Sequence, residues 1–208
     1  MTPMAESKIQ FDPEPHIYTV DGRVIPSVTQ ILEDTGLVDY SALPPSIRDA
    51  ALERGEQVHR AIALYFQGDL DESSVPANYQ GYFQAALTFC MDVDMKTEPD
   101  GLEMRGYVER PEYCGTLDLV GNLLVPRIGR RNCLVDWKTG AAEPWVRLQT
   151  AAYAKFFEHP ATRYRVCVEL HQNGAYKSHW MPPTTFPADW QQWESVAVTY
   201  HMKRSLKW

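Results

Sequence analysis

The alternation of apolar and polar residues predicts a β-hairpin near the start of the chain and helices after it. The run His16–Val20 enters an Asp-Gly pair and Arg23–Ile25 leaves it, which is typical of a hairpin closed by a two-residue turn. Ser27 can cap a short helix that we expect to end near Gly36. The helical spacing of apolar residues then predicts two longer helices, over 47–67 and 76–91.

Strand-like segments follow in the middle of the chain. We expect strands over 97–108, 113–120 and 132–138, with 126–131 as a basic hairpin tip. A helix over 144–158, a hairpin over 163–171 and 175–181, and a last helix over 187–204 complete the pattern. This order predicts an α/β or α+β fold with a central mixed sheet flanked by helices. The length of 208 residues favours one domain, with the N-terminal hairpin and helices in about 1–95 and the sheet core in about 96–208.

Charge is distributed unevenly along the chain. The net charge of −7 argues against a generic basic coat for nucleic acid. Residues 1–103 hold 6 basic and 18 acidic residues, a net of −12, whereas residues 104–208 hold 14 basic and 9 acidic residues, a net of +5. The second half can therefore offer a confined basic surface, although two differently solvated faces would give the same count.

The spacing of the cysteines and the length of the apolar runs indicate the cellular compartment. The cysteines are widely spaced and form no C-x-x-C pair, which makes a zinc ribbon unlikely on spacing alone and favours reduced core thiols. The apolar runs fall short of the ~20 residues of a membrane-spanning helix, and Met1–Gln10 has no apolar core of a secretory signal. We therefore expect a cytoplasmic protein that has no membrane partner.

Charged residues interrupt two apolar strands in the middle of the chain. Period two places Asp136 and Lys138 on one face together with Leu134, and Asp118 on the face of Thr116 and Val120. Burying such charges is costly unless they pair or bind a metal. If the strands are neighbours, Asp118 and Asp136 can converge on Mg²⁺, with Lys138 pointing into the same pocket. A buried Asp–Lys ion pair is the alternative interpretation.

These residues belong to an ordered set of four motifs. Gly115 to Asp118 reads G-x-x-D and Asp136 to Lys138 reads D-x-K. Upstream, Arg54 to His59 reads R-G-x-x-x-H, and downstream, Gln149 to Tyr153 reads Q-x-x-x-Y. In order and spacing the set, which covers 54–153, resembles the PD-(D/E)xK nuclease superfamily and within it the RecB-like exonucleases of phages and prophages.

The resemblance implies a restriction-endonuclease-like core and roles for particular residues. It implies one or two Mg²⁺ or Mn²⁺ ions held by His59, Asp118, Asp136 and the backbone carbonyl of Trp137, with Lys138 orienting or activating water. It places Gln149 and Tyr153 along the cleft, although a surface Gln–Tyr pair is the alternative. A glutamate on the preceding strand would lie near a second metal position, and we prefer Glu103 to Glu109 for it.

The resemblance also implies a substrate and partners. We expect a DNA exonuclease of phage or bacterial recombination and repair, with a structure-specific endonuclease or a non-catalytic DNA-binding protein as alternatives. Cys167 is the only cysteine after Cys133, so the grouped late cysteines of relatives with an iron–sulfur cluster are missing and no such cluster is expected. Helicase motifs are also missing, so a single-strand annealing or recombination partner would be a separate protein. The candidate phosphate contacts are Arg54, Arg127, Arg130, Arg131 and Arg147.

Overall fold

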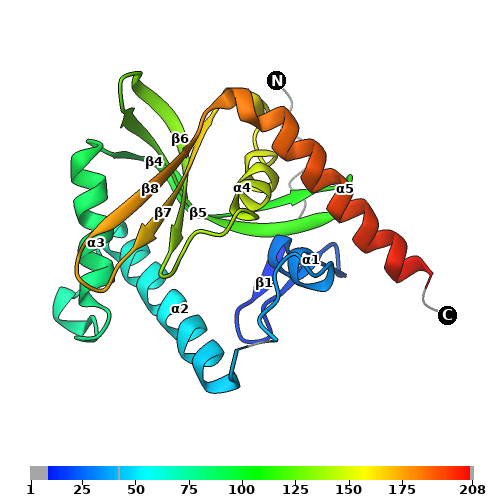
Figure 1. Ribbon diagram of the computed structural model, residues 1–208, viewed down its shortest axis with the longest axis horizontal. Helices are drawn as coiled ribbons and strands as arrows, with labels where there is room; N and C mark the ends of the chain where they lie inside the picture. The colour runs from blue at the N-terminus through cyan, green and yellow to red at the C-terminus, as the bar shows by residue number, and fades with distance from the viewer. Residues whose placement is uncertain (1–8, 42, 207–208) are drawn as a thin grey trace.

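Two β-sheets and five α-helices make up the described part of the computed structural model, which covers residues 9–41 and 43–206 (Figure 1). The larger sheet contains β4 (Lys96–Val108), β5 (Tyr113–Val125), β6 (Gly129–Lys138), β7 (Tyr164–Leu170) and β8 (Tyr176–Met181), in that spatial order. The parallel pair β6–β7 joins otherwise antiparallel neighbours, so the sheet is mixed. The predicted fold class is confirmed. The N-terminal stretch expected to lack a secretory signal falls almost entirely on residues 1–8, outside the described residues.

The smaller sheet contains β1 (Ile9–Asp12), β2 (Ile17–Val20) and β3 (Arg23–Ile25). The hairpin β2–β3 was predicted, and its Asp21 and Gly22 both have positive φ, as a type I′ turn requires. β1 was not predicted. The sheet packs on β5 through Tyr18, whose hydroxyl lies 2.8 Å from Thr116 Oγ1.

Helices cover both faces of the larger sheet. They are α1 (Val28–Asp34), α2 (Pro45–Gln67), α3 (Gln80–Asp92), α4 (Val146–Ala154) and α5 (Phe186–Ser205), with short 3₁₀ turns at Glu72–Ser74, Pro160–Thr162 and Pro183–Thr185. A capping box between Ser27 and Gln30 starts α1, as the predicted cap requires. One core lies between the sheet and α2 and α3, and a second lies between the sheet and α1, α4 and α5. Among the described residues, no helix combines the length and the apolar character that a membrane crossing needs.

Several predicted boundaries were wrong, and the helix expected over 76–91 begins at Gln80. The expected hairpin tip over 126–131 is shorter, because β5 continues to Val125 and β6 begins at Gly129. Arg130 belongs to the strand, where it pairs with Asp94 and donates 2.9 Å to the carbonyl of Asp94. The helix expected over 144–158 ends at Ala154, and Phe156 beyond it packs directly over Gly106 of β4.

Candidate functional site

The strand ladder around Asp118 is interrupted in a way that exposes its carboxylate to α2. The pairing of β5 with β6 ends at Leu119–Val135, and beyond it the Trp137 N–H donates to Asp118 Oδ2 at 2.7 Å. On the other side of Asp118, Glu103 of β4 has a φ of +47°. The side-chain alternation changes at this point, since Leu119 belongs to the core under α2 whereas Leu117 belongs to the other core.

This change of face corrects the period-two expectation for Asp118. The carboxylate does not stay on the Val120 side of the sheet but turns toward α2, where it meets His59. The prediction for β6 is confirmed, because Leu134 lies in the core under α4 while Trp137 lies in the core under α2. A left-handed backbone at a glutamate is sterically unfavourable, and nothing in the local pattern signals it.

His59 lies on α2 and contacts two oxygen atoms of the sheet. Its Nδ1 is 3.2 Å from Asp118 Oδ1, and its Nε2 is 3.1 Å from the backbone carbonyl of Trp137. The neighbouring Val58 and Ile62 are buried in the core, so the helix is held firmly against the sheet. The imidazole therefore bridges the Asp118 carboxylate and the Trp137 carbonyl.

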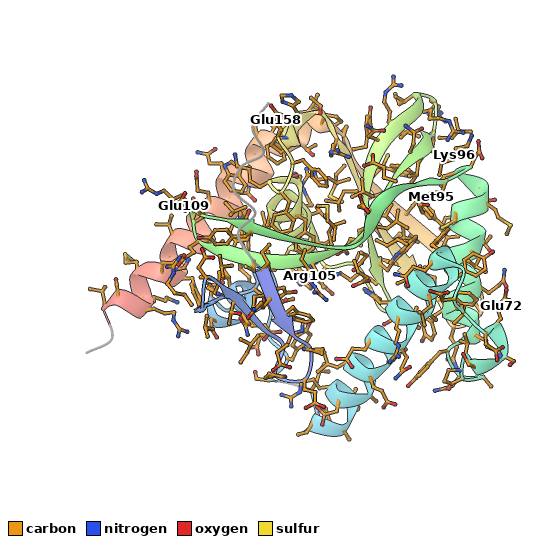
Figure 2. The ribbon with its side chains drawn as sticks, turned by 180° about the vertical axis from the view of Figure 1, so that it is seen from behind. Glu72, Met95, Lys96, Arg105, Glu109 and Glu158 are labelled. Atoms are coloured by element: carbon orange, nitrogen blue, oxygen red, sulfur yellow. The ribbon has the colours of Figure 1, made fainter. Side chains whose placement is uncertain are left out.

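Three side chains here form a group with metal-ligating geometry. His59, Glu103 and Asp118 each offer one ligand atom, and these atoms all lie within 4.8 Å of one another. The structure thus brings Glu103 into the site. Glu109 follows the end of β4, and Figure 2 shows it at the far end of the β4–β5 ladder from α2. Asp136 is not among the three residues of this group.

The charges of the group perturb one another. Burial lowers the pKa of His59, but the charge and hydrogen bond of Asp118 outweigh it and raise the pKa to about 9. Desolvation and then the Asp118 carboxylate raise the pKa of Glu103 to about 7. Burial opposes ionisation of Asp118, but His59, Lys138 and the Trp137 N–H together lower its pKa.

Asp136 and Lys138 form an ion pair next to this group. Lys138 Nζ lies 2.8 Å from Asp136 Oδ2, with 3% of the Asp136 side chain and 21% of the Lys138 side chain exposed. Burial and then the Asp118 charge raise the pKa of Asp136, against the attraction of Lys138. Desolvation lowers the pKa of Lys138, but Asp136 and Asp118 outweigh it and raise the pKa. Lys138 is therefore a cation near neutral pH, and its ammonium also lies 5.7 Å from the centre of the Trp145 ring.

Gln149 and Tyr153 lie on α4 and are both buried, which excludes the alternative of a surface pair. Gln149 Nε2 donates to the Tyr153 hydroxyl at 3.1 Å, and Gln149 Oε1 has no hydrogen-bond partner among the described residues. Burial, followed by the charges of Asp136 and Asp118, raises the pKa of Tyr153 well above its usual range. A Cβ at Gly115 would lie 2.7 Å from Tyr153 Cε1, so the glycine of G-x-x-D makes room for this ring.

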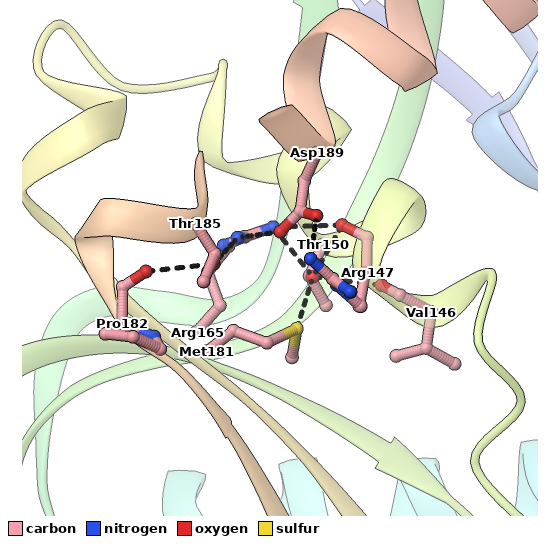
Figure 3. A network of polar contacts seen from close by, with 8 residues as sticks. All are labelled: Val146, Arg147, Thr150, Arg165, Met181, Pro182, Thr185 and Asp189. Atoms are coloured by element: carbon pink, nitrogen blue, oxygen red, sulfur yellow. Dashed lines mark hydrogen bonds and ion pairs between the residues drawn. The ribbon is translucent and has the colours of Figure 1, made fainter. Parts of the chain in front are cut away.

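A buried ionic network holds α4 in place (Figure 3). The fully buried Arg165 of β7 lies against Asp189 of α5 and donates 2.9 Å to the carbonyl of Arg147 at the start of α4. The second Asp189 oxygen lies 2.7 Å from the Arg147 guanidinium. Because β7, α4 and α5 meet in one network, it fixes the helix that carries Gln149 and Tyr153.

The five arginines expected to contact phosphate lie in different surroundings. Arg130 and Arg147 already pair with Asp94 and Asp189. The Arg54 guanidinium lies 5.5 Å from the ring centre of Tyr82, on α3. The other two are exposed, Arg127 at the hairpin turn and Arg131 on β6.

Sequence reasoning missed Glu169 and the Arg165–Asp189 pair. Glu169 is buried, and its Oε1 accepts from Ala142 N–H at 2.8 Å, in the loop between Lys138 and α4. The signal that singled out Asp136, a charge in an otherwise apolar strand, is also present at Arg165 and Glu169 of β7.

No family model matches this chain, and comparison with curated proteins also returns no match.

Proposed function

We propose that the protein is a Mg²⁺- or Mn²⁺-dependent deoxyribonuclease that degrades DNA from its ends. The observation that supports this most is that the His59, Glu103 and Asp118 group lies next to the Asp136–Lys138 ion pair. The resemblance of the four motifs to RecB-like exonucleases supplies the substrate class and the exonucleolytic mode.

The residues fit a divalent cation on chemical grounds. Burial and then the charge of the neighbouring Asp118 carboxylate raise the pKa of Glu103 to about 7, and a cation between the two carboxylates would relieve their repulsion. Carboxylate and carbonyl oxygens suit Mg²⁺ and Mn²⁺, and the single imidazole of His59 is more compatible with Mn²⁺. Asp118 and His59, with Glu103, would be the side-chain ligands, and the Trp137 carbonyl adjoins them.

The residues of the site would have different roles in phosphodiester hydrolysis. A bound metal would polarise the phosphodiester and lower the pKa of water. The Lys138 ammonium, held by Asp136, stabilises the negative charge that develops on the phosphate oxygens and orients the attacking water. Gln149 Oε1 is buried and has no hydrogen-bond partner among the described residues, so it would accept a hydrogen bond from a buried water.

The cellular setting follows from the same resemblance. We place the protein in the cytoplasm of a bacterial or phage-infected cell, in DNA recombination or repair. A single-strand annealing or recombination protein would act beside it as a separate chain.

End-labelled linear DNA and covalently closed circular DNA, each incubated with Mg²⁺, Mn²⁺ or EDTA, test the proposal. We expect the label to be lost from linear DNA in either metal and to be retained in EDTA, while the circles stay intact. Cleavage of the circular DNA would show that the protein is an endonuclease and not an exonuclease. If the protein binds DNA but cleaves neither the linear nor the circular DNA in the presence of metal, it is a non-catalytic DNA-binding protein.

Matched variants test the assignment of residues. Glu103→Gln should lose activity by at least tenfold, whereas Glu109→Gln at the far end of β4 should keep it. Asp136→Asn and Lys138→Met should abolish cleavage, with Lys203→Met on the exposed end of α5 as the control for loss of a cation. Thermal melting should show that the inactive variants are folded.

A further inference from the structure

Polar side chains continue from the candidate site across the sheet to its exposed edge. In the register of β6, β7 and β8, Lys138 pairs with Glu169 and Glu169 pairs with Lys177. One row further along, Asp136 and His179 flank the same residue of β7. Since directly paired residues point to the same face of a sheet, these two rows share the face of the ion pair. Lys177 lies two strand spacings from Lys138, about 10 Å.

Glu169 is the buried centre of this patch. Its side chain is 8% exposed, and Oε1 accepts from Ala142 N–H and lies 2.8 Å from His179 Nε2. Oε2 lies 3.9 Å from Lys177 Nζ and 4.0 Å from His171 Nε2. One carboxylate thus contacts two imidazoles, one ammonium and one backbone amide.

The patch is layered by charge. The Lys177, His171 and His179 side chains are 65%, 46% and 35% exposed, whereas Glu169 and Asp136 are 8% and 3% exposed. Solvent therefore meets an ammonium and two imidazole rings, and the carboxylates lie beneath them. A phosphate above this layer would meet the Lys177 ammonium, which has three N–H donors that one shared carboxylate cannot saturate.

We propose that Lys177, with the rings of His179 and His171 beside it, binds the phosphate of the DNA strand that flanks the scissile phosphate. The proposal rests on the nuclease function, because the occupant is inferred from the adjacent site for a phosphodiester. Glu169 acts as a positioning residue, since it aims His179 and anchors the loop that follows Lys138. On a purely structural interpretation the three donors would only neutralise Glu169, and Lys177 would be dispensable for DNA binding.

Fluorescence anisotropy with a labelled single-stranded oligonucleotide in EDTA, over a series of salt concentrations, tests the site. Lys177→Ala should weaken binding roughly fivefold at low salt and reduce the slope of log K against log salt by about 0.7, the value for one lost phosphate contact. His179→Ala should weaken binding less than Lys177→Ala, because the His179 Nε2 faces Glu169. Lys203→Ala, which removes an exposed cation on α5, should change neither quantity.

Several outcomes overturn the proposal. Unchanged affinity and slope in Lys177→Ala, equal losses in Lys203→Ala, or no binding by the wild-type chain would each do so. Because Lys177 is exposed on an edge strand, the variant should fold, and circular dichroism checks this. The measurement needs no cleavage, so a wild-type chain that binds but does not cut in Mn²⁺ would refute the nuclease function while the salt slope still decides this site.

Discussion

The Asp189→Ala variant would leave the Arg165 guanidinium buried without its carboxylate. The Arg165 and Asp189 side chains are 0% and 1% exposed, so water cannot replace the lost partner. Breaking such a pair from one side destabilises a protein by about 3–5 kcal/mol. For a chain of this size, that corresponds to a fall in Tm of about 6–20 °C.

Arg147→Ala is the matched control, because Arg147 binds the same carboxylate from a side chain that is 53% exposed. An exposed partner contributes only about 0–1 kcal/mol. The double variant Arg165→Met/Asp189→Leu removes both buried charges and should regain most of the lost stability. Urea unfolding followed by circular dichroism measures all three. Equal losses in Asp189→Ala and Arg147→Ala, or a double variant as unstable as Asp189→Ala, would refute the reasoning.

Two further predictions concern the site. Gly115→Ala should destabilise the chain by about 1–3 kcal/mol and disturb the Tyr153 ring. Gly140→Ala should be nearly neutral, because no atom of the described residues lies within 4 Å of an added Cβ, and urea unfolding of both variants decides this. Protons compete with metal at His59, with a pKa of about 9, and at Glu103, with a pKa of about 7. Mn²⁺ affinity should therefore rise about tenfold per pH unit from pH 7 to 8.5 and more steeply below pH 7, and calorimetry that finds a flat profile would contradict this.

Local patterns predicted the parts of the fold that depend on local physics. The Asp21-Gly22 turn and the Ser27 cap follow from backbone preferences of two or three residues, and the structure confirms both. The hairpin tip at Arg130 was wrong because pairing of two long strands, together with an ion pair to Asp94, overrides the turn tendency of a basic segment. The end of α4 was wrong for a similar reason, since Phe156 packs over Gly106.

The candidate site was predictable as a set of residues but not as a geometry. Motif spacing named His59, Asp118 and Lys138, and the structure shows His59 in contact with Asp118 and Lys138 in contact with Asp136. Glu103 was preferred to Glu109 from the sequence, but the positive φ at Glu103, opposite Asp118, is not signalled by the sequence. The support from Glu169 depends on the parallel pairing of β6 with β7, which joins residues 31 positions apart through a crossover helix.

A crystal soaked in Mn²⁺ tests the central claim most directly, because anomalous scattering locates the ion. The account predicts a peak within about 2.5 Å of Asp118, with His59 and Glu103 around it, and loss of that peak in Asp118→Asn. An ion bound at Glu169 and His179 instead, or no peak at the group of three, would contradict a metal-dependent nuclease built on this site.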